Sequence, residues 1–126
     1  MRRKASSRDV VEEVFREALS SRFSREFYQV FIFYIDRDLG RDPFEVFLED
    51  PARVYGKIEE IYGFGATFIF RAIYDYIRGK MRLNISFDEF LYIVKSGDKE
   101  SLKKILASLL EASGCSNPCT LGKWGA

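Results

Sequence analysis

Apolar residues recur along most of the chain at the spacing of an α-helix. The pattern starts after Ser6 and Ser7, either of which can act as an N-cap. The first stripe consists of Val10, Val11, Val14, Phe15, Ala18 and Leu19. Side chains three and four residues apart share one face of a helix, so this stretch predicts a helix with one buried side.

The stretch FYQVFIFYI, residues 27–35, is apolar on nearly all sides. Ser24 can cap its start and Gly40 can end it, which gives a segment of helix length rather than strand length. Its aromatic and β-branched residues leave a strand as the alternative. We expect a helix over about residues 25–39, and an apolar helix of this kind is predicted to be central and surrounded by the others.

Asp-Pro pairs and serine caps divide the rest of the chain into further helices. Asp42-Pro43 and Asp50-Pro51 each place an N-cap before a proline that suits the first helical position. Glu45 is placed to complete a capping box with Asp42. Further helices are predicted over residues 66–80, over residues 87–95 behind a capping box of Ser86 and Glu89, and behind Asp98.

Together these segments predict an all-α protein. It has six to seven helices in one compact, orthogonal or bundle-like domain over residues 7–113. Residues 1–6 are expected to be a flexible basic arm and residues 114–126 a mobile C-terminal tail.

Composition argues against common catalytic chemistry. The chain has no histidine, which removes the usual general base near neutral pH and the commonest metal ligand. The grouped carboxylates are Asp36, Asp38, Asp42, Glu45, Glu49 and Asp50, and they fall at helix ends where acids are expected in any case. We therefore predict a protein that is not an enzyme and has no cofactor or metal.

The segment NISFDEF has the back half of a calcium-binding EF-hand loop but lacks the front half. Arg78, Lys80 and Arg82 stand where oxygen ligands are needed, and Leu83 replaces the turn glycine. Calcium binding is therefore not expected. Gly63-Phe64-Gly65 lacks the remainder of a phosphate-binding loop and predicts a connection between helices.

The two cysteines, Cys115 and Cys119, flank the sequence Ser-Asn-Pro. A disulfide across this turn and two free thiols both fit the spacing. The two thiols could also supply two of the four ligands of a zinc ion, with the other two from a second subunit. This alternative is weaker because no histidine is present.

Charge is spread unevenly along the chain, although the net charge is only +1. Arg2, Arg3, Lys4 and Arg8 form a basic arm that suits contacts with nucleic-acid phosphates. Nucleic-acid binding is kept as the alternative function, because the low net charge argues against it.

Aromatic residues make up 16% of the chain, many for one small core. Rings are enriched at protein interfaces, so some are expected on the surface. The candidate interface residues are Tyr28, Phe33, Phe64, Phe68, Tyr74 and Tyr92. The leading prediction is a protein that works by association with itself or with another protein.

The segment LGRDPFEVFLEDPARVYGKIEEIYG resembles a segment of short archaeal all-α proteins of uncharacterised function. The resemblance rests on Gly40, Asp42-Pro43, Glu45-Val46, Glu49-Asp50-Pro51, Tyr55 and Gly63. It implies an all-α fold and brings no catalytic residues. Abundant charge and only three amide side chains are typical of thermophile proteins, which agrees with it.

The start of the chain does not have the pattern of a signal peptide. MRRKASSR is basic, but an amphipathic stretch follows it instead of an apolar one. The apolar run at residues 27–35 is much shorter than the roughly 20 residues that span a bilayer. We expect a cytoplasmic protein with no membrane partner.

Overall fold

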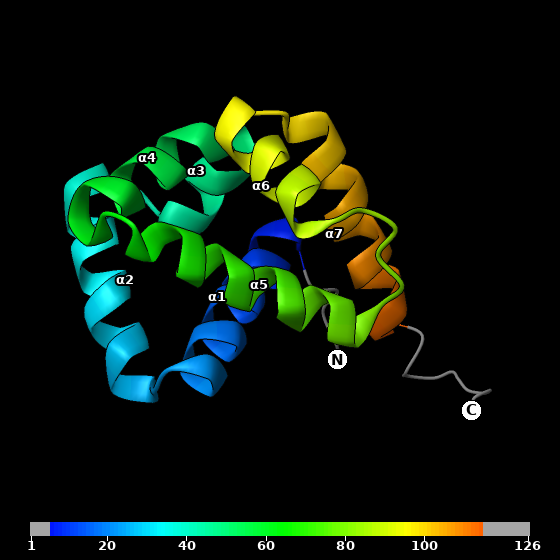
Figure 1. Ribbon diagram of the computed structural model, residues 1–126, viewed down its shortest axis with the longest axis horizontal. Coiled ribbons are helices and arrows are strands. Elements are labelled where there is room, and N and C mark those ends of the chain that lie inside the picture. Colours follow the sequence, from blue (N-terminus) through cyan, green and yellow to red (C-terminus); the bar gives the residue numbers. More distant parts are fainter. Residues whose placement is uncertain (1–5, 115–126) are drawn as a thin grey trace.

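Seven α-helices and no strand occur in residues 6–114, the part of the chain that the computed structural model describes (Figure 1). In chain order they are α1 (Ser7–Arg22), α2 (Arg25–Leu39), α3 (Pro43–Glu49), α4 (Pro51–Tyr62), α5 (Gly65–Lys80), α6 (Phe87–Ser96) and α7 (Lys99–Gly114). The predicted all-α class and single domain are confirmed. Most of the predicted basic arm and C-terminal tail lies outside the described residues.

Serine side chains begin three of the helices, as predicted. The Ser86 hydroxyl accepts a hydrogen bond from the Glu89 N–H at 3.1 Å, and the Glu89 carboxylate accepts one from the Ser86 N–H at 2.9 Å. Ser6 and Asp9 form the same reciprocal pair at the start of α1. Ser24 accepts from a backbone N–H in the first turn of α2 at 2.9 Å. These bonds satisfy donors that a helix leaves free at its start.

One predicted cap is wrong. Helix α3 begins at Pro43, but the Asp42 side chain makes no capping hydrogen bond, and the expected capping box with Glu45 is absent. The Asp42 carboxylate instead binds Arg8 of α1. The equivalent cap of α4 is confirmed, because Asp50 accepts from the Arg53 N–H at 3.4 Å.

Helices α1 and α5 form the centre of the fold. They pack against each other, and α1 also contacts α2, α3 and α7, while α5 contacts α4, α6 and α7. All six residues of the predicted α1 stripe are buried. Helix α5 buries seven side chains: Ala66, Ile69, Phe70, Ala72, Ile73, Tyr74 and Ile77.

Four phenylalanines from three helices meet at this centre. Phe15 of α1 has its ring centroid 5.7 Å from that of Phe44 and 5.3 Å from that of Phe47, both in α3. Phe70 of α5 lies 6.3 Å from Phe15, nearly perpendicular to it. These edge-to-face contacts are favourable for aromatic rings. Phe15, Phe44, Phe47 and Phe70 are called the buried phenylalanine cluster below.

Helix α2 has the predicted bounds but lies at the edge of the molecule (Figure 1). It buries Tyr28, Phe31, Ile35 and Leu39 against its neighbours, which are α1, α3 and α4. Its opposite side is exposed, although three of the residues there are Val30, Phe33 and Tyr34. The expectation that α2 is surrounded by other helices is therefore corrected: its apolar residues cover one side of the core and also form part of the surface.

Candidate association surface

The exposed side of α2 carries a narrow stripe formed by Glu26, Val30, Phe33 and Arg37. At about 100° per residue these four side chains lie within about 60° of one another. Val30 is 51% exposed and Phe33 is 60% exposed. Both values are high for large apolar side chains, and the charged residues stand at the two ends of the stripe.

Aromatic and cationic groups gather at the C-terminal end of this stripe. The rings of Phe33 and Tyr34 are 5.4 Å apart and close to perpendicular. The Arg37 guanidinium lies 4.8 Å from the centre of the Tyr34 ring and 5.8 Å from that of Phe33. A guanidinium at this distance is attracted to the ring face, so Arg37 partly covers two exposed rings.

The corner between α4 and α5 adds further aromatic side chains next to α2. Tyr62, the last residue of α4, has its ring 5.7 Å from Phe27 and 5.9 Å from Phe31 of α2. The chain then turns, and Phe64 is 93% exposed and Phe68 is 66% exposed. Figure 1 shows this corner beside α2 on one side of the molecule.

These exposed side chains are called the aromatic face below. They come from the end of α1, from α2 and from the α4–α5 corner, and they are Phe23, Val30, Phe33, Tyr34, Phe64 and Phe68. Single exposed apolar residues are ordinary on a protein surface, but a group of them is a feature of interaction sites.

Two of the predicted interface residues are buried and do not belong to this face. Tyr28 is only 8% exposed and packs against Phe31, and its burial raises its pKa to about 12. Tyr74 is 5% exposed, and its hydroxyl donates to the Ile85 carbonyl at 2.6 Å. Tyr92 is 70% exposed, but it lies on α6, away from α2. Their spacing holds a signal for this burial. Tyr28 shares a helix face with Phe31 and Ile35, and Tyr74 shares one with Phe70 and Ile77.

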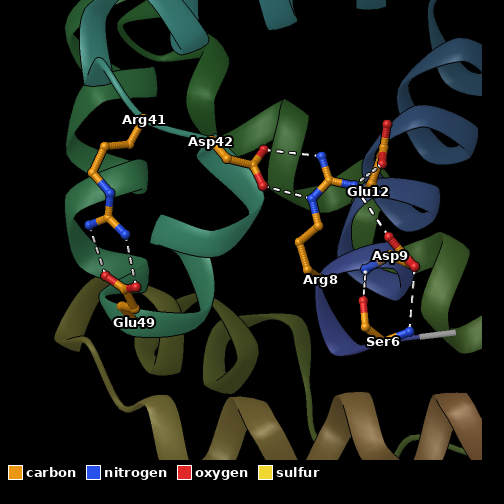
Figure 2. Close-up of polar contacts among 7 residues, drawn as sticks. All are labelled: Ser6, Arg8, Asp9, Glu12, Arg41, Asp42 and Glu49. Atoms are coloured by element: carbon orange, nitrogen blue, oxygen red, sulfur yellow. Dashed lines mark hydrogen bonds and ion pairs between the residues drawn. The ribbon is translucent and has the colours of Figure 1, made fainter.

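The candidate acids of residues 36–50 are largely engaged with arginines. The Asp42 carboxylate accepts from Arg8 Nε at 2.6 Å and from Nη2 at 3.2 Å, and Glu12 also binds Arg8 (Figure 2). The hydrogen bond from Arg8 holds the pKa of Asp42 below its ordinary value, although partial burial opposes this. The same contact raises the pKa of Arg8.

A second arginine takes up another of these acids. Arg41 donates to Glu49 through both terminal nitrogens, at 3.0 and 2.9 Å (Figure 2). This bidentate contact holds the pKa of Glu49 below its ordinary value. Asp38 accepts from Arg37 at 3.1 Å, and Asp50 caps α4. Three of the six candidate acids therefore bind arginines and a fourth caps a helix, so these four groups stabilise helix ends and junctions.

Arg8 does not have the free guanidinium that was expected of a nucleic-acid contact. Asp42, Glu12 and Asp9 all bind it, and it lies 5.2 Å from the centre of the Phe44 ring. Arg2, Arg3 and Lys4 lie outside the described residues, as do Cys115 and Cys119.

Among residues 6–114 no three metal-ligating side chains come together in a group. A hollow of about 420 Å³ lies between α1 and α2, lined by Arg16, Glu17, Ser20, Arg25, Tyr28 and Gln29. Cofactor sites are mostly apolar and enclosed, whereas this hollow has charged side chains around it. No helix in the described part of the chain has the length and apolar character needed to cross a bilayer.

No protein-family model, curated protein or solved structure matches this chain. The resemblance to short archaeal proteins stays a prediction.

Proposed function

We propose that this protein acts by association with another protein surface, through the aromatic face of α2 and the α4–α5 corner. The observation that carries the proposal is the exposure of Phe33, Phe64 and Phe68, at 60%, 93% and 66%. Each ring keeps a large apolar area in water. Covering that area with a partner is favourable, at about 25 cal/mol for each Å² removed from water.

The distribution of the exposed rings supports the proposal. The same chain buries Phe15, Phe31, Phe70 and Phe90 almost completely, so its core does not lack aromatic side chains. The exposed rings lie mainly on α2 and the corner next to it, and on α2 the charged residues Glu26 and Arg37 stand at the two ends of the exposed stripe. An apolar centre with a polar rim is the usual organisation of a protein interface.

Binding rather than catalysis is proposed because the chain offers few groups for chemistry. It contains no histidine. Asp42 and Glu49 are held by Arg8 and Arg41, so a substrate would have to displace an arginine to reach either carboxylate.

Nucleic-acid binding through the basic arm is the weaker alternative. Arg8 is a poor candidate for a phosphate contact, because its charge is already balanced by the carboxylates of Glu12 and Asp42. Without this residue the alternative depends on Arg2, Arg3 and Lys4, which are outside the described part of the chain.

Site-specific photo-crosslinking tests the proposal. The photoreactive residue benzoylphenylalanine replaces Phe33 or Phe64 on the aromatic face, and replaces Tyr92 on α6 in a matched control that is also well exposed. The protein is irradiated in a lysate of its source organism, and the adducts are identified by mass spectrometry.

We expect protein adducts from positions 33 and 64, either with a second copy of the chain or with another protein, and far fewer from position 92. Equal labelling from all three positions would mean that the aromatic face has no special role. Adducts with nucleic acid alone would favour the alternative function.

A further inference from the structure

The stripe on the exposed side of α2 is symmetric about its own midpoint. Glu26 and Arg37 lie at its two ends, and Val30 and Phe33 lie between them. The intervals along the chain are four, three and four residues, so the midpoint falls between Val30 and Phe33. Side chains at these intervals lie on one face of a helix, and they form the usual seam between two packed helices.

We propose that the partner of this face is a second copy of the chain, with the two α2 helices packed antiparallel about a two-fold axis. The inference rests on the proposed function and specifies its partner. A rotation about the midpoint of the stripe places Val30 opposite Phe33 of the second copy. The same rotation places Glu26 opposite Arg37 of the second copy, twice in each dimer. A two-fold interface must be complementary to itself, and this stripe meets that condition in both shape and charge.

The charges select the antiparallel arrangement. A parallel pair in register would place Glu26 against Glu26 and Arg37 against Arg37, and like charges at an interface are unfavourable. The antiparallel pair instead forms two ion pairs at the rim of an apolar centre.

The end groups are accessible for such contacts. Glu26 is exposed in the first turn of α2. The Arg37 side chain is 58% exposed and donates to its neighbour Asp38 at 3.1 Å. To reach Glu26 of a second copy, Arg37 would leave this exposed ion pair and its positions over the Tyr34 and Phe33 rings. Each of these contacts contributes only a modest free energy at an exposed site.

The size of the contact predicts a weak dimer. Helix α2 has 15 residues and is therefore about 22 Å long. One pair of helices of this length covers less than the roughly 800 Å² per partner of a standard interface, so we expect a dissociation constant in the micromolar range or weaker. The stripe then determines the orientation of the two copies.

Charge exchange between the two ends of the stripe tests the inference. Sedimentation velocity is measured from about 1 µM to about 1 mM, a range set by the expected affinity, for the full chain and for Glu26→Arg, Arg37→Glu and the double variant. Each single variant brings like charges together twice in the dimer, so we expect its dissociation constant to rise about tenfold or more. The double variant restores both ion pairs and is expected to dimerise like the original protein.

A mixture of the two single variants provides the sharpest result. In a mixed pair every end contact joins an arginine to a glutamate, so the heterodimer is expected to form as tightly as the original dimer, although each variant alone dimerises about tenfold more weakly or worse. Lys103→Glu on α7 is the control, because it makes the same charge change as Arg37→Glu at an exposed site outside the stripe. Circular dichroism of every variant shows whether the helices are intact.

The outcomes separate this inference from the proposed function. A protein that stays monomeric at all concentrations, or a dimer that both single variants leave unchanged, overturns the two-fold pairing. Photo-crosslinks from position 33 to a different protein would then still support association through the aromatic face. Absence of both the dimer and the crosslinks rejects the two ideas together.

Discussion

The buried phenylalanine cluster and the aromatic face use the same residue type in two different ways. Phe70 is completely buried between α1, α3 and α4, whereas Phe64, six residues earlier in the chain, is 93% exposed. The cluster has neighbouring helices on every side, and the face has helix on one side only. The comparison teaches that aromatic content measures how much apolar surface a chain holds, while the helix arrangement decides whether the chain covers that surface itself.

The largest expected effect comes from opening the cluster. Phe70→Ala leaves a cavity among four helices and is expected to lower the free energy of unfolding by about 3 to 5 kcal/mol. Phe33→Ala removes the same atoms from the surface, so a change within about 0.5 kcal/mol is expected. Urea denaturation followed by circular dichroism measures both. Similar losses for the two variants would contradict the distinction between cluster and face.

A smaller effect is expected at the polar edge of the cluster, where Asp42 holds Arg8 over the Phe44 ring. Asp42→Asn removes the charge-assisted hydrogen bonds and is expected to cost about 1 to 2 kcal/mol at pH 7. Glu49→Gln is the control at an exposed ion pair, where less than about 1 kcal/mol is expected. Denaturation at pH 7 compares the two.

The pH dependence of the Asp42 contribution has a definite sign. Because the pKa of Asp42 is lower in the folded state than in the unfolded state, its contribution is complete above about pH 4 and is lost as the pH falls through the folded value. The difference in unfolding free energy between the original protein and Asp42→Asn is therefore expected to shrink as the pH falls below about 4. A constant difference would mean that the ion pair is not its source.

Tyr74 was predicted to lie on the interface but is buried, so its contribution to the free energy of unfolding can be tested. Tyr74→Phe keeps the ring but removes the hydroxyl that donates to the Ile85 carbonyl. A loss of about 0.5 to 1.5 kcal/mol is expected, the usual net value of such a hydrogen bond. Tyr92→Phe, at an exposed ring on α6, is the control and is expected to change the unfolding free energy very little.

The smallest effect on stability is expected on the aromatic face itself. Phe64→Ser with Phe68→Ser removes two exposed rings, and we expect the unfolding free energy to change by about 0.5 kcal/mol or less. Retention time on a hydrophobic-interaction column should fall clearly, because the two rings are accessible to the resin. A large loss of stability would place these rings in the fold rather than on a binding surface.

Local signals predicted much of the fold because a cap or a stripe needs only residues close in sequence. Ser86 and Glu89 are three residues apart, and their reciprocal bonds form as predicted. Arg8 and Asp42 are 34 residues apart, and their contact depends on how α1 meets α3. The predicted cap of α3 is wrong because the Asp42 carboxylate binds Arg8 instead of the backbone N–H groups at the start of α3.

The position of α2 was missed for a similar reason. Hydrophobic periodicity shows which side chains share a helix face, but it does not show how many neighbouring helices cover that helix. Phe31 and Phe33 are equally apolar, yet one is 1% exposed and the other 60%. Only the packing of α1 and α4 against one side of α2 separates them. The stripe with its two charged ends is visible in the sequence once the exposed side is known.

The pairing of α1 with α5 and α7 has a consequence for how the chain is made. Ribosomal synthesis produces α1 before α5 and α7. Helices α2 and α3 can cover part of the buried side of α1 early, but the part that packs on α5 and α7 lacks its partners until those helices have been added. At ordinary rates of elongation this delay is on the order of several seconds. During that time the nascent chain displays an amphipathic helix with an open apolar side, which is the kind of segment that holding chaperones bind. The nascent chain therefore exposes an apolar surface that differs from the aromatic face of the folded protein, and this surface is covered when α5 and then α7 fold against α1.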